Sequence, residues 1–225
     1  MIIEVADLLN PRELEILRDM YRHGTARDGV LSAEVHAARV KNNRELALSE
    51  QHAARVRGLI VTACNRLPYL VNALAPKMIS SPLLSLYETG MAYGSHIDSA
   101  IGESRGETFR SDISCTVFLD DPNAYDGGEL YIETEYGDRT FKAPAGHAVF
   151  YPTLFRHQVK PVSRGLRRVC VFWAQSLIRD PRRRLLIFEL AQASSWLGRE
   201  GVSREEIRAK LTTVRENLYR MWLDG

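Results

Sequence analysis

The region from about residue 82 to 176 constrains the fold most strongly, because turn residues divide it into short apolar or alternating runs. Short strands with a turn signal about every 8–12 residues are typical of a β-sandwich or barrel. No helix-length segment separates the runs, which argues against a parallel sheet built from crossover helices. The predicted strands are residues 83–88, 113–119, 129–132, 139–142, 148–151, 157–162 and 167–175.

Residues 1–80 have the pattern of helices. Asn10 is a helix cap, and Glu13 three residues later completes a capping box with a proline between them at the first helical position. A second helix is predicted from Ser49, because apolar residues then recur on one helical face. Pro68 is expected to interrupt this helix.

Residues 181–225 return to a helical pattern. Pro181 begins one predicted helix, and Ser203 with Glu206 forms a capping box for the next. The apolar stripe of this last helix is expected to pack against the core or against a second subunit, so the protein is a candidate homo-oligomer. We expect one domain over 1–180, with N-terminal helices in 1–80 and a strand-rich core in 82–178, and a C-terminal helical extension over 181–225.

Three side chains in the strand-rich region have the chemistry of a metal site. His96 and Asp98 are two residues apart, so in an extended strand both point to the same face. His157 begins a later run. Two imidazoles and one carboxylate are the ligands of the facial triad of non-haem iron(II) oxygenases, which leaves positions on the ion open for substrates.

A basic residue follows the second histidine. Arg167 lies ten residues after His157, and the turn signals in 161–165 predict that it returns on a neighbouring strand. Alternation along 167–173 turns Arg167 into the barrel, where a guanidinium needs an anionic partner. A fork-shaped guanidinium suits the far carboxylate of a 2-oxo acid that chelates iron through its other end.

Each of these residues has an ordinary structural interpretation when it is taken alone. A single histidine at a strand start is commonly a hydrogen-bonded core residue, and Arg167 could pair with an internal acid. Arg164 and Arg168 flank Arg167 as rivals. His147 competes as the third ligand, but its position in a turn favours an exposed side chain. The order His-x-Asp, His, Arg within one strand-rich region favours the joint interpretation.

Longer motifs surround these residues. They are Ser-Asp-Ile-Ser-Cys-Thr-Val-Phe-Leu and Tyr-Asp-Gly-Gly-Glu-Leu in 111–130, and Trp-Ala-Gln-Ser-Leu-Ile-Arg-Asp at the end of 157–180. With 86–98, these segments resemble the iron(II)- and 2-oxoglutarate-dependent dioxygenases of the prolyl/lysyl hydroxylase-like (PKHD-type) group, in the bacterial branch linked to iron uptake. The resemblance covers nearly the whole chain. It implies an α+β fold, a double-stranded β-helix (jelly-roll) core flanked by helices.

The resemblance also implies the site and its cofactors. His96, Asp98 and His157 would bind Fe(2+), Arg167 would bind the distal carboxylate of 2-oxoglutarate, and L-ascorbate would be the helper reductant. Tyr87 either donates a hydrogen bond to the same carboxylate or packs as a core aromatic. With O2, the expected reaction hydroxylates an unidentified substrate, a protein residue or a small molecule such as a siderophore, and releases succinate and CO2.

Three alternatives remain open on the residues alone. A non-catalytic module that senses iron or a 2-oxo acid would share all four residues. A structural zinc site would need a fourth protein ligand, usually a thiolate, and no cysteine lies at a short metal-ligand spacing. A nucleic-acid demethylase is disfavoured because Lys and Arg total 30 against 28 for Asp and Glu, a net charge of +2.

The sequence also bears on location and access to the site. No apolar run approaches the roughly 18 residues needed to cross a membrane, and the N-terminus has acidic residues where a signal peptide is basic. Three widely spaced cysteines indicate a reducing compartment, so we expect a cytoplasmic protein. The polar segment 99–112 directly follows the first two candidate ligands and is expected to be either a mobile lid or a plain surface insertion.

Overall fold

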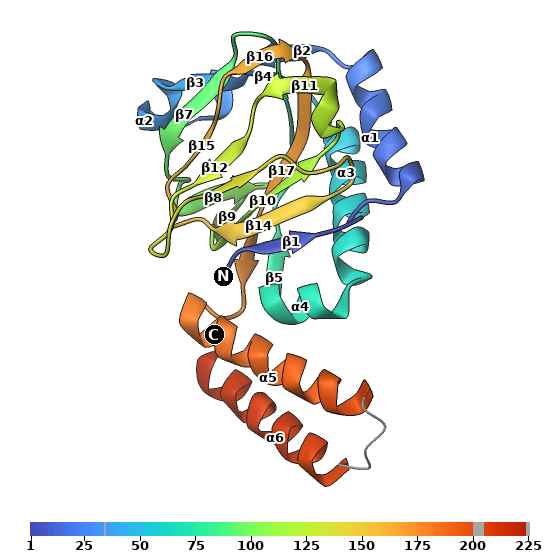
Figure 1. Ribbon diagram of the computed structural model, residues 1–225, viewed down its shortest axis with the longest axis vertical. Helices are drawn as coiled ribbons and strands as arrows, with labels where there is room; N and C mark the ends of the chain where they lie inside the picture. The colour runs from blue at the N-terminus through green and yellow to red at the C-terminus, as the bar shows by residue number, and fades with distance from the viewer. Residues whose placement is uncertain (34, 200–204, 224–225) are drawn as a thin grey trace.

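Two antiparallel sheets face each other in the computed structural model, which describes residues 1–33, 35–199 and 205–223 (Figure 1). The larger sheet has the order β1 (Ile3–Val5), β14 (Ala148–Pro152), β10 (Ile113–Phe118), β17 (Arg167–Ser176), β6 (Leu83–Tyr87), β4 (Arg44–Leu46) and β2 (Ala26–Asp28), and β5 (Pro76–Ile79) also pairs with β17. The smaller sheet has the order β13 (Arg139–Phe141), β12 (Leu130–Ile132), β15 (His157–Val159), β7 (Ala92–His96) and β3 (Lys41–Asn42).

Two short strand pairs complete the barrel. β11 (Tyr125–Gly127) pairs with β16 (Val162–Gly165), and β8 (Ile101–Ser104) pairs with β9 (Glu107–Arg110). Buried side chains from both large sheets form one core between them, which includes Phe118 and Val169 from one sheet and Leu130 from the other. Facing antiparallel sheets around one core agree with the sandwich or barrel that the strand pattern predicts and with the jelly roll that the family resemblance implies.

Helices cover the outer face of the larger sheet (Figure 1). Asn10 and Glu13 cap α1 (Pro11–His23) reciprocally, and Ser49 caps α3 (Glu50–Asn65), as predicted. Pro68 does more than interrupt α3, because it begins a new helix, α4 (Pro68–Leu74). Apolar side chains of these helices and of the outward-facing strand residues form a second core. The short helical segments are η1 (Gly29–Ser32), α2 (Val35–Ala38) and η2 (Pro122–Ala124).

The expectation that residues 1–80 are helical is wrong in part, because β1 to β5 lie among the helices and belong to the two sheets. Each of these strands has only two to four residues. Runs this short show no periodicity, and their pairing depends on tertiary neighbours. β3 and β4 matter most for the site, since β3 extends the smaller sheet and β4 the larger one.

The C-terminal segment forms a helical hairpin of α5 (Pro181–Arg199) and α6 (Glu205–Trp222), which projects from one end of the barrel (Figure 1). The predicted cap Ser203 lies outside the described residues. Within the part of the chain that the structure describes, no helix combines the length and the apolar character that crossing a membrane requires.

The segment 99–112 is an ordered hairpin rather than an irregular loop. β8 and β9 pair from Ile101 with Arg110 to Ser104 with Glu107, and the two turn residues between them both have positive φ. Such a turn matches the twist of the flanking strands. The Ser104 hydroxyl accepts a hydrogen bond from the Ser81 backbone N–H at 2.9 Å, which fastens the hairpin to the loop before β6.

Candidate metal centre

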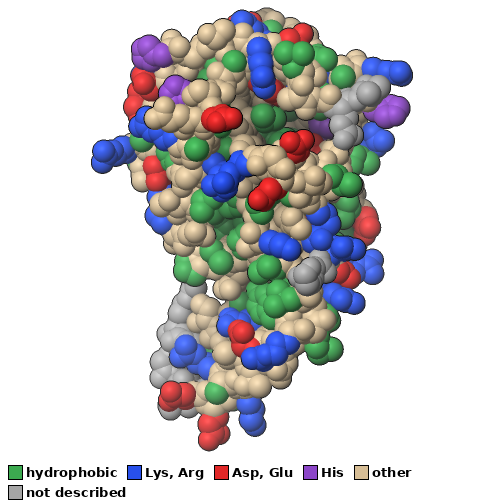
Figure 2. Space-filling view, turned by 180° about the vertical axis from the view of Figure 1, so that it is seen from behind, with side chains coloured by type: hydrophobic (Ala, Val, Ile, Leu, Met, Phe, Trp, Pro, Cys, Tyr) green, Lys and Arg blue, Asp and Glu red, His purple; other side chains and the backbone are tan. Residues whose placement is uncertain are grey.

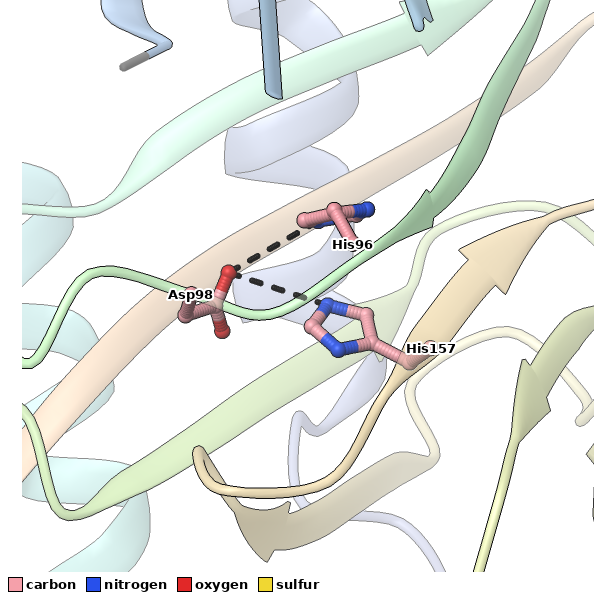
Figure 3. A group of neighbouring side chains, drawn as sticks. All are labelled: His96, Asp98 and His157. Carbon is pink, nitrogen blue, oxygen red and sulfur yellow. Dashed lines mark ion pairs between the residues drawn. The ribbon is translucent and has the colours of Figure 1, made fainter. Parts of the chain in front are cut away.

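The three predicted ligands converge inside the barrel (Figure 3). His96 is the last residue of β7, Asp98 follows it by two residues, and His157 is the first residue of β15. Because β7 and β15 are paired, His96 and His157 lie opposite each other. Nε2 of His96 is 3.8 Å and Nε2 of His157 is 3.7 Å from Oδ1 of Asp98. One ligand atom from each residue lies within 4.8 Å of the others, so the three fit around one ion.

Both imidazoles are oriented by backbone carbonyls. Nδ1 of His96 lies 2.8 Å from the Gly94 oxygen, and Nδ1 of His157 lies 3.1 Å from the Phe155 oxygen. A carbonyl accepts, so each Nδ1 carries the proton and each Nε2 keeps a lone pair for a metal. Burial, and secondarily the neighbouring His157, lower the pKa of His96 to about 4, which keeps this imidazole neutral at physiological pH.

The carboxylate of Asp98 is held by two donors on its other oxygen. The Ser114 hydroxyl and the Trp173 indole N–H, the latter at 2.9 Å, both donate to Oδ2. Ser114 and Trp173 are paired residues of β10 and β17, so the register of these two strands brings both donors to the same carboxylate. The two bonds leave Oδ1 turned toward the imidazoles, which suits a carboxylate that binds through a single oxygen.

Arg167 is 1% exposed, and its Nε, Nη1 and Nη2 atoms have no hydrogen-bond partner. Its Cζ lies 5.0 Å from the centre of the Tyr87 ring and 5.7 Å from that of Phe118. The buried hydroxyl of Tyr125 likewise has no partner. Buried polar groups are almost always hydrogen-bonded, and a buried charge is paired. The unpaired guanidinium therefore fits an anion such as a carboxylate bound beside it.

Gly128 makes room for this guanidinium. Its φ is +67°, and a Cβ at this position would lie 2.9 Å from Cδ of Arg167 and 3.1 Å from the Tyr125 ring. Glycine is therefore required here both for the backbone conformation and for the close approach. The Tyr-Asp-Gly-Gly-Glu-Leu motif thus brings both Tyr125 and Gly128 next to the arginine.

Arg167 reaches this position from the larger sheet, so the expectation that its strand neighbours that of His157 is wrong. β17 pairs with β10, β6 and β5, whereas β15 pairs with β12 and β7. The chain crosses between the sheets through β16, which pairs with β11. The arginine and the two histidines therefore face one another across the barrel interior.

One cavity of about 750 Å³ is lined by His96, Asp98, His157, Arg167 and Tyr87, whereas Tyr125 and Ser114 are not among its lining residues. The β8–β9 hairpin contributes to the same lining.

His147, the rival third ligand, lies elsewhere, with Nε2 3.4 Å from a carboxylate oxygen of Asp7, and its side chain is half-buried rather than fully exposed. Among the described residues, the group that could hold a metal has no cysteine in it, unlike a closed zinc site.

A jelly roll whose interior carries two histidines, an aspartate and a buried arginine defines the class of non-haem iron oxygenases that use a 2-oxo acid. The sequence model of the 2OG-Fe(II) oxygenase superfamily matches residues 82–175. PKHD-type hydroxylases from Verminephrobacter eiseniae and Xanthomonas axonopodis are 40% and 39% identical to the chain over 228 residues, and each alignment covers all of both proteins. The chain belongs to the PKHD-type hydroxylases, which are iron(II)- and 2-oxoglutarate-dependent dioxygenases.

Solved structures support the fold. A prolyl-4-hydroxylase from Pseudomonas putida has a TM-score of 0.54 at 19% identity and covers 77% of this chain and 92% of its own. A prolyl hydroxylase from Trichoplax adhaerens has a TM-score of 0.59 at 14% identity and covers 82% and 86%. The predicted α+β jelly-roll class is confirmed by this likeness.

Sequence reasoning missed several residues of the site. Ser114, Trp173 and Tyr125 are buried or half-buried polar groups in motifs that were already recognised. Alternation along the strand of Arg167 turns Trp173 inward, because the two share one face. Ser114 could not be found in this way, because its inward direction follows from its pairing with Trp173. No local signal pointed to Tyr125, because its place beside Arg167 depends on the β11–β16 pair.

Proposed function

We propose that this dioxygenase binds Fe(2+) through His96, Asp98 and His157, binds 2-oxoglutarate through Arg167, and hydroxylates a substrate with release of succinate and CO2. The observation that carries the proposal is a buried guanidinium without a partner in the same cavity as a cluster of two histidines and one aspartate. When bound, the iron supplies the redox chemistry that couples decarboxylation of the 2-oxo acid to hydroxylation.

The protein residues orient the reactants and exclude water. The carbonyls behind His96 and His157 fix the two Nε2 atoms toward the centre, and the donors on Asp98 fix its Oδ1. Arg167 would neutralise the far carboxylate of the cosubstrate, and the buried Tyr125 hydroxyl, which also has no partner, is proposed as a second donor to the same group. Tyr87 lies with its ring beside the guanidinium, which supports packing rather than donation as its role.

The substrate and the cellular setting are part of the proposal. We infer hydroxylation of a protein residue or of a small molecule such as a siderophore, a link to iron uptake, L-ascorbate as helper reductant and action in the cytoplasm. Basic and acidic side chains are interspersed on the face shown in Figure 2, which supports a partner other than nucleic acid. No membrane partner is proposed. The C-terminal hairpin is proposed to begin after residue 180 and to join two copies of the chain.

Anaerobic iron titration of the wild type, His96→Ala and Arg167→Ala tests the proposal, followed by 2-oxoglutarate and then oxygen. His96→Ala is expected to lose iron binding, whereas Arg167→Ala is expected to keep iron and lose affinity for 2-oxoglutarate. Wild-type protein is expected to release succinate when oxygen is admitted. Binding of both ligands without succinate would instead support a non-catalytic sensor.

A further inference from the structure

The segment from Lys41 to Glu45 has an unusual inward face. Lys41, Asn43 and Glu45 are buried, at 9%, 3% and 1% exposure, whereas Asn42 and Arg44 between them are exposed. Alternation of this kind is expected at a sheet face, but the inward side is normally apolar. Here the chain turns two charged residues and an amide inward as it crosses from the smaller sheet to the larger one.

Lys41 and Glu45 form an ion pair in which one carboxylate oxygen has no hydrogen-bond partner. Nζ of Lys41 lies 2.7 Å from Oε1 of Glu45, and the Ser32 hydroxyl accepts from the same Nζ and donates to the same Oε1, each at 2.7 Å. The other carboxylate oxygen, Oε2, is buried and has no hydrogen-bond partner. An ionised carboxylate accepts on both oxygens, so one strong acceptor in this wall is unused.

The pair lies in the wall of the cavity that contains the metal cluster. Ser32, Lys41 and Glu45 line it together with His96. Lys41 pairs with Tyr93 across the β3–β7 edge, and its Nζ lies 5.2 Å from the centre of the Tyr93 ring. That ring stacks on the His96 imidazole with centroids 3.6 Å apart. A molecule bound at the ion pair is therefore one aromatic ring away from a proposed metal ligand.

Stability alone does not account for this pair. Taking two charges out of water costs several kcal/mol for each ion, and replacing a buried pair by apolar residues of similar size is often neutral or stabilising. An unpaired buried oxygen adds a further cost, because it loses its hydrogen bonds to water and gains none. Such departures from the usual pattern concentrate at functional sites.

We propose that Lys41 and Glu45 recognise the substrate of the dioxygenase through its amino-acid head group. Glu45 Oε2 accepts from the N–H of that group, and Lys41 donates to its carboxylate or carbonyl oxygen. A ligand with a single charge is attracted by one of the two groups and repelled by the other, so it gains little net binding energy from the pair. An N–H donor and a neighbouring oxygen acceptor match Glu45 and Lys41 together. Both groups are present in a free amino acid and in every peptide residue except proline.

The inference rests on the proposed function for its catalytic meaning, and a binding experiment tests it separately. Protein loaded with iron(II) and 2-oxoglutarate without oxygen is titrated in a calorimeter. The probes are L-proline and L-lysine as free amino acids, and N-acetyl-L-alaninamide and N-acetyl-L-lysinamide as peptide residues that keep a backbone N–H. Butyrate and butylamine, each with one charge, are the control ligands. We expect saturable binding of at least one probe and no binding of either control ligand. Whether the free amino acids or the blocked ones bind shows whether the substrate is a free amino acid or a peptide residue.

Two variants assign the binding to the ion pair. The double variant Lys41→Met/Glu45→Leu removes both charges together, so it is expected to keep its melting temperature and its affinity for 2-oxoglutarate and to bind the probe at least about tenfold more weakly. If the double variant does not fold, Glu45→Gln takes its place in the test. This variant keeps the size of the side chain and is expected to bind the probe more weakly. Arg44→Gln, on the exposed side of the same segment, is the matched control and is expected to bind as the wild type does.

Two outcomes would overturn the inference. One is wild-type protein that binds 2-oxoglutarate and none of the four probes. The other is a folded double variant, or Glu45→Gln, with unchanged probe affinity. Failure of the wild type to bind iron or 2-oxoglutarate at all would contradict the proposed function instead, so the two failures are distinguishable.

Discussion

Asp98 shows how single residues control the site, because two side chains decide which of its oxygens faces the histidines. Ser114 and Trp173 donate to Oδ2 and leave Oδ1 between the two Nε2 atoms. Both donors bind the carboxylate of Asp98, so their effect on a metal is exerted through this carboxylate. Groups that hold a ligand in this way commonly change metal affinity by about 10–100-fold when they are removed.

We therefore expect Trp173→Phe to bind iron(II) roughly tenfold more weakly than the wild type, because Asp98 loses one of its two donors. Anaerobic titration calorimetry measures this affinity. Trp196→Phe is the matched control, since Trp196 is exposed on α5, and it is expected to bind iron normally. Equal iron affinity in Trp173→Phe and the wild type would contradict the role given to the indole.

The Tyr125 hydroxyl is a second residue-scale case. It is buried without a hydrogen-bond partner, and so is the guanidinium of Arg167 beside it. A carboxylate bound there would accept hydrogen bonds from both groups. Tyr125→Phe removes one hydrogen bond to a charged group, which corresponds to about tenfold weaker binding of 2-oxoglutarate. Tyr136→Phe, at 96% exposure, is the control. If the affinity of Tyr125→Phe is unchanged, the hydroxyl makes no bond to the cosubstrate.

At the scale of elements, the sequence predicted what is local and missed what depends on partners. Seven strands between residues 82 and 176 were predicted because each run has its own alternation and its own turn, but β7, β8, β9, β11 and β16 were not among them. His96 and Asp98 were found by their spacing, and His157 by its place at the start of a run. β3 and β4 were missed because so short a run has no period. The same reason hid the inward-facing Lys41 and Glu45, whose burial requires both sheets to be in place.

The β8–β9 hairpin connects element structure to access to the cavity. Its residues line the cavity, and Ser104 fastens it to Ser81. We expect Ser104→Ala to destabilise the hairpin by about 1 kcal/mol, which is a roughly fivefold larger equilibrium constant for local opening, because one hydrogen-bonding group is lost. Hydrogen exchange of the amides in Glu107–Arg110 measures this opening. Ser163→Ala, on the exposed part of β16, is the control. Unchanged exchange would mean that other contacts hold the hairpin.

At the scale of the whole molecule, the metal cluster and the C-terminal hairpin occupy separate parts. The cavity is inside the barrel, whereas α5 and α6 project from one end of it (Figure 1). Burial of the cluster therefore does not require the outer surface of α6. This separation makes the hairpin available for contacts with a second copy without closing the cavity.

The outer face of α6 has the spacing of a helix-pairing seam. Ile207, Val214 and Met221 recur every seven residues and are 45%, 47% and 71% exposed. Apolar residues at this interval follow one line along a helix and favour pairing with a second helix.

We expect the protein to be a dimer and Val214→Glu to be a monomer, because a carboxylate in the seam would lose its hydration. Light scattering at micromolar protein measures the mass, and Thr213→Glu beside the seam is the control. A wild-type mass equal to that of one chain would refute the dimer. Unchanged binding of iron and 2-oxoglutarate by Val214→Glu would show that the site is complete within a single chain.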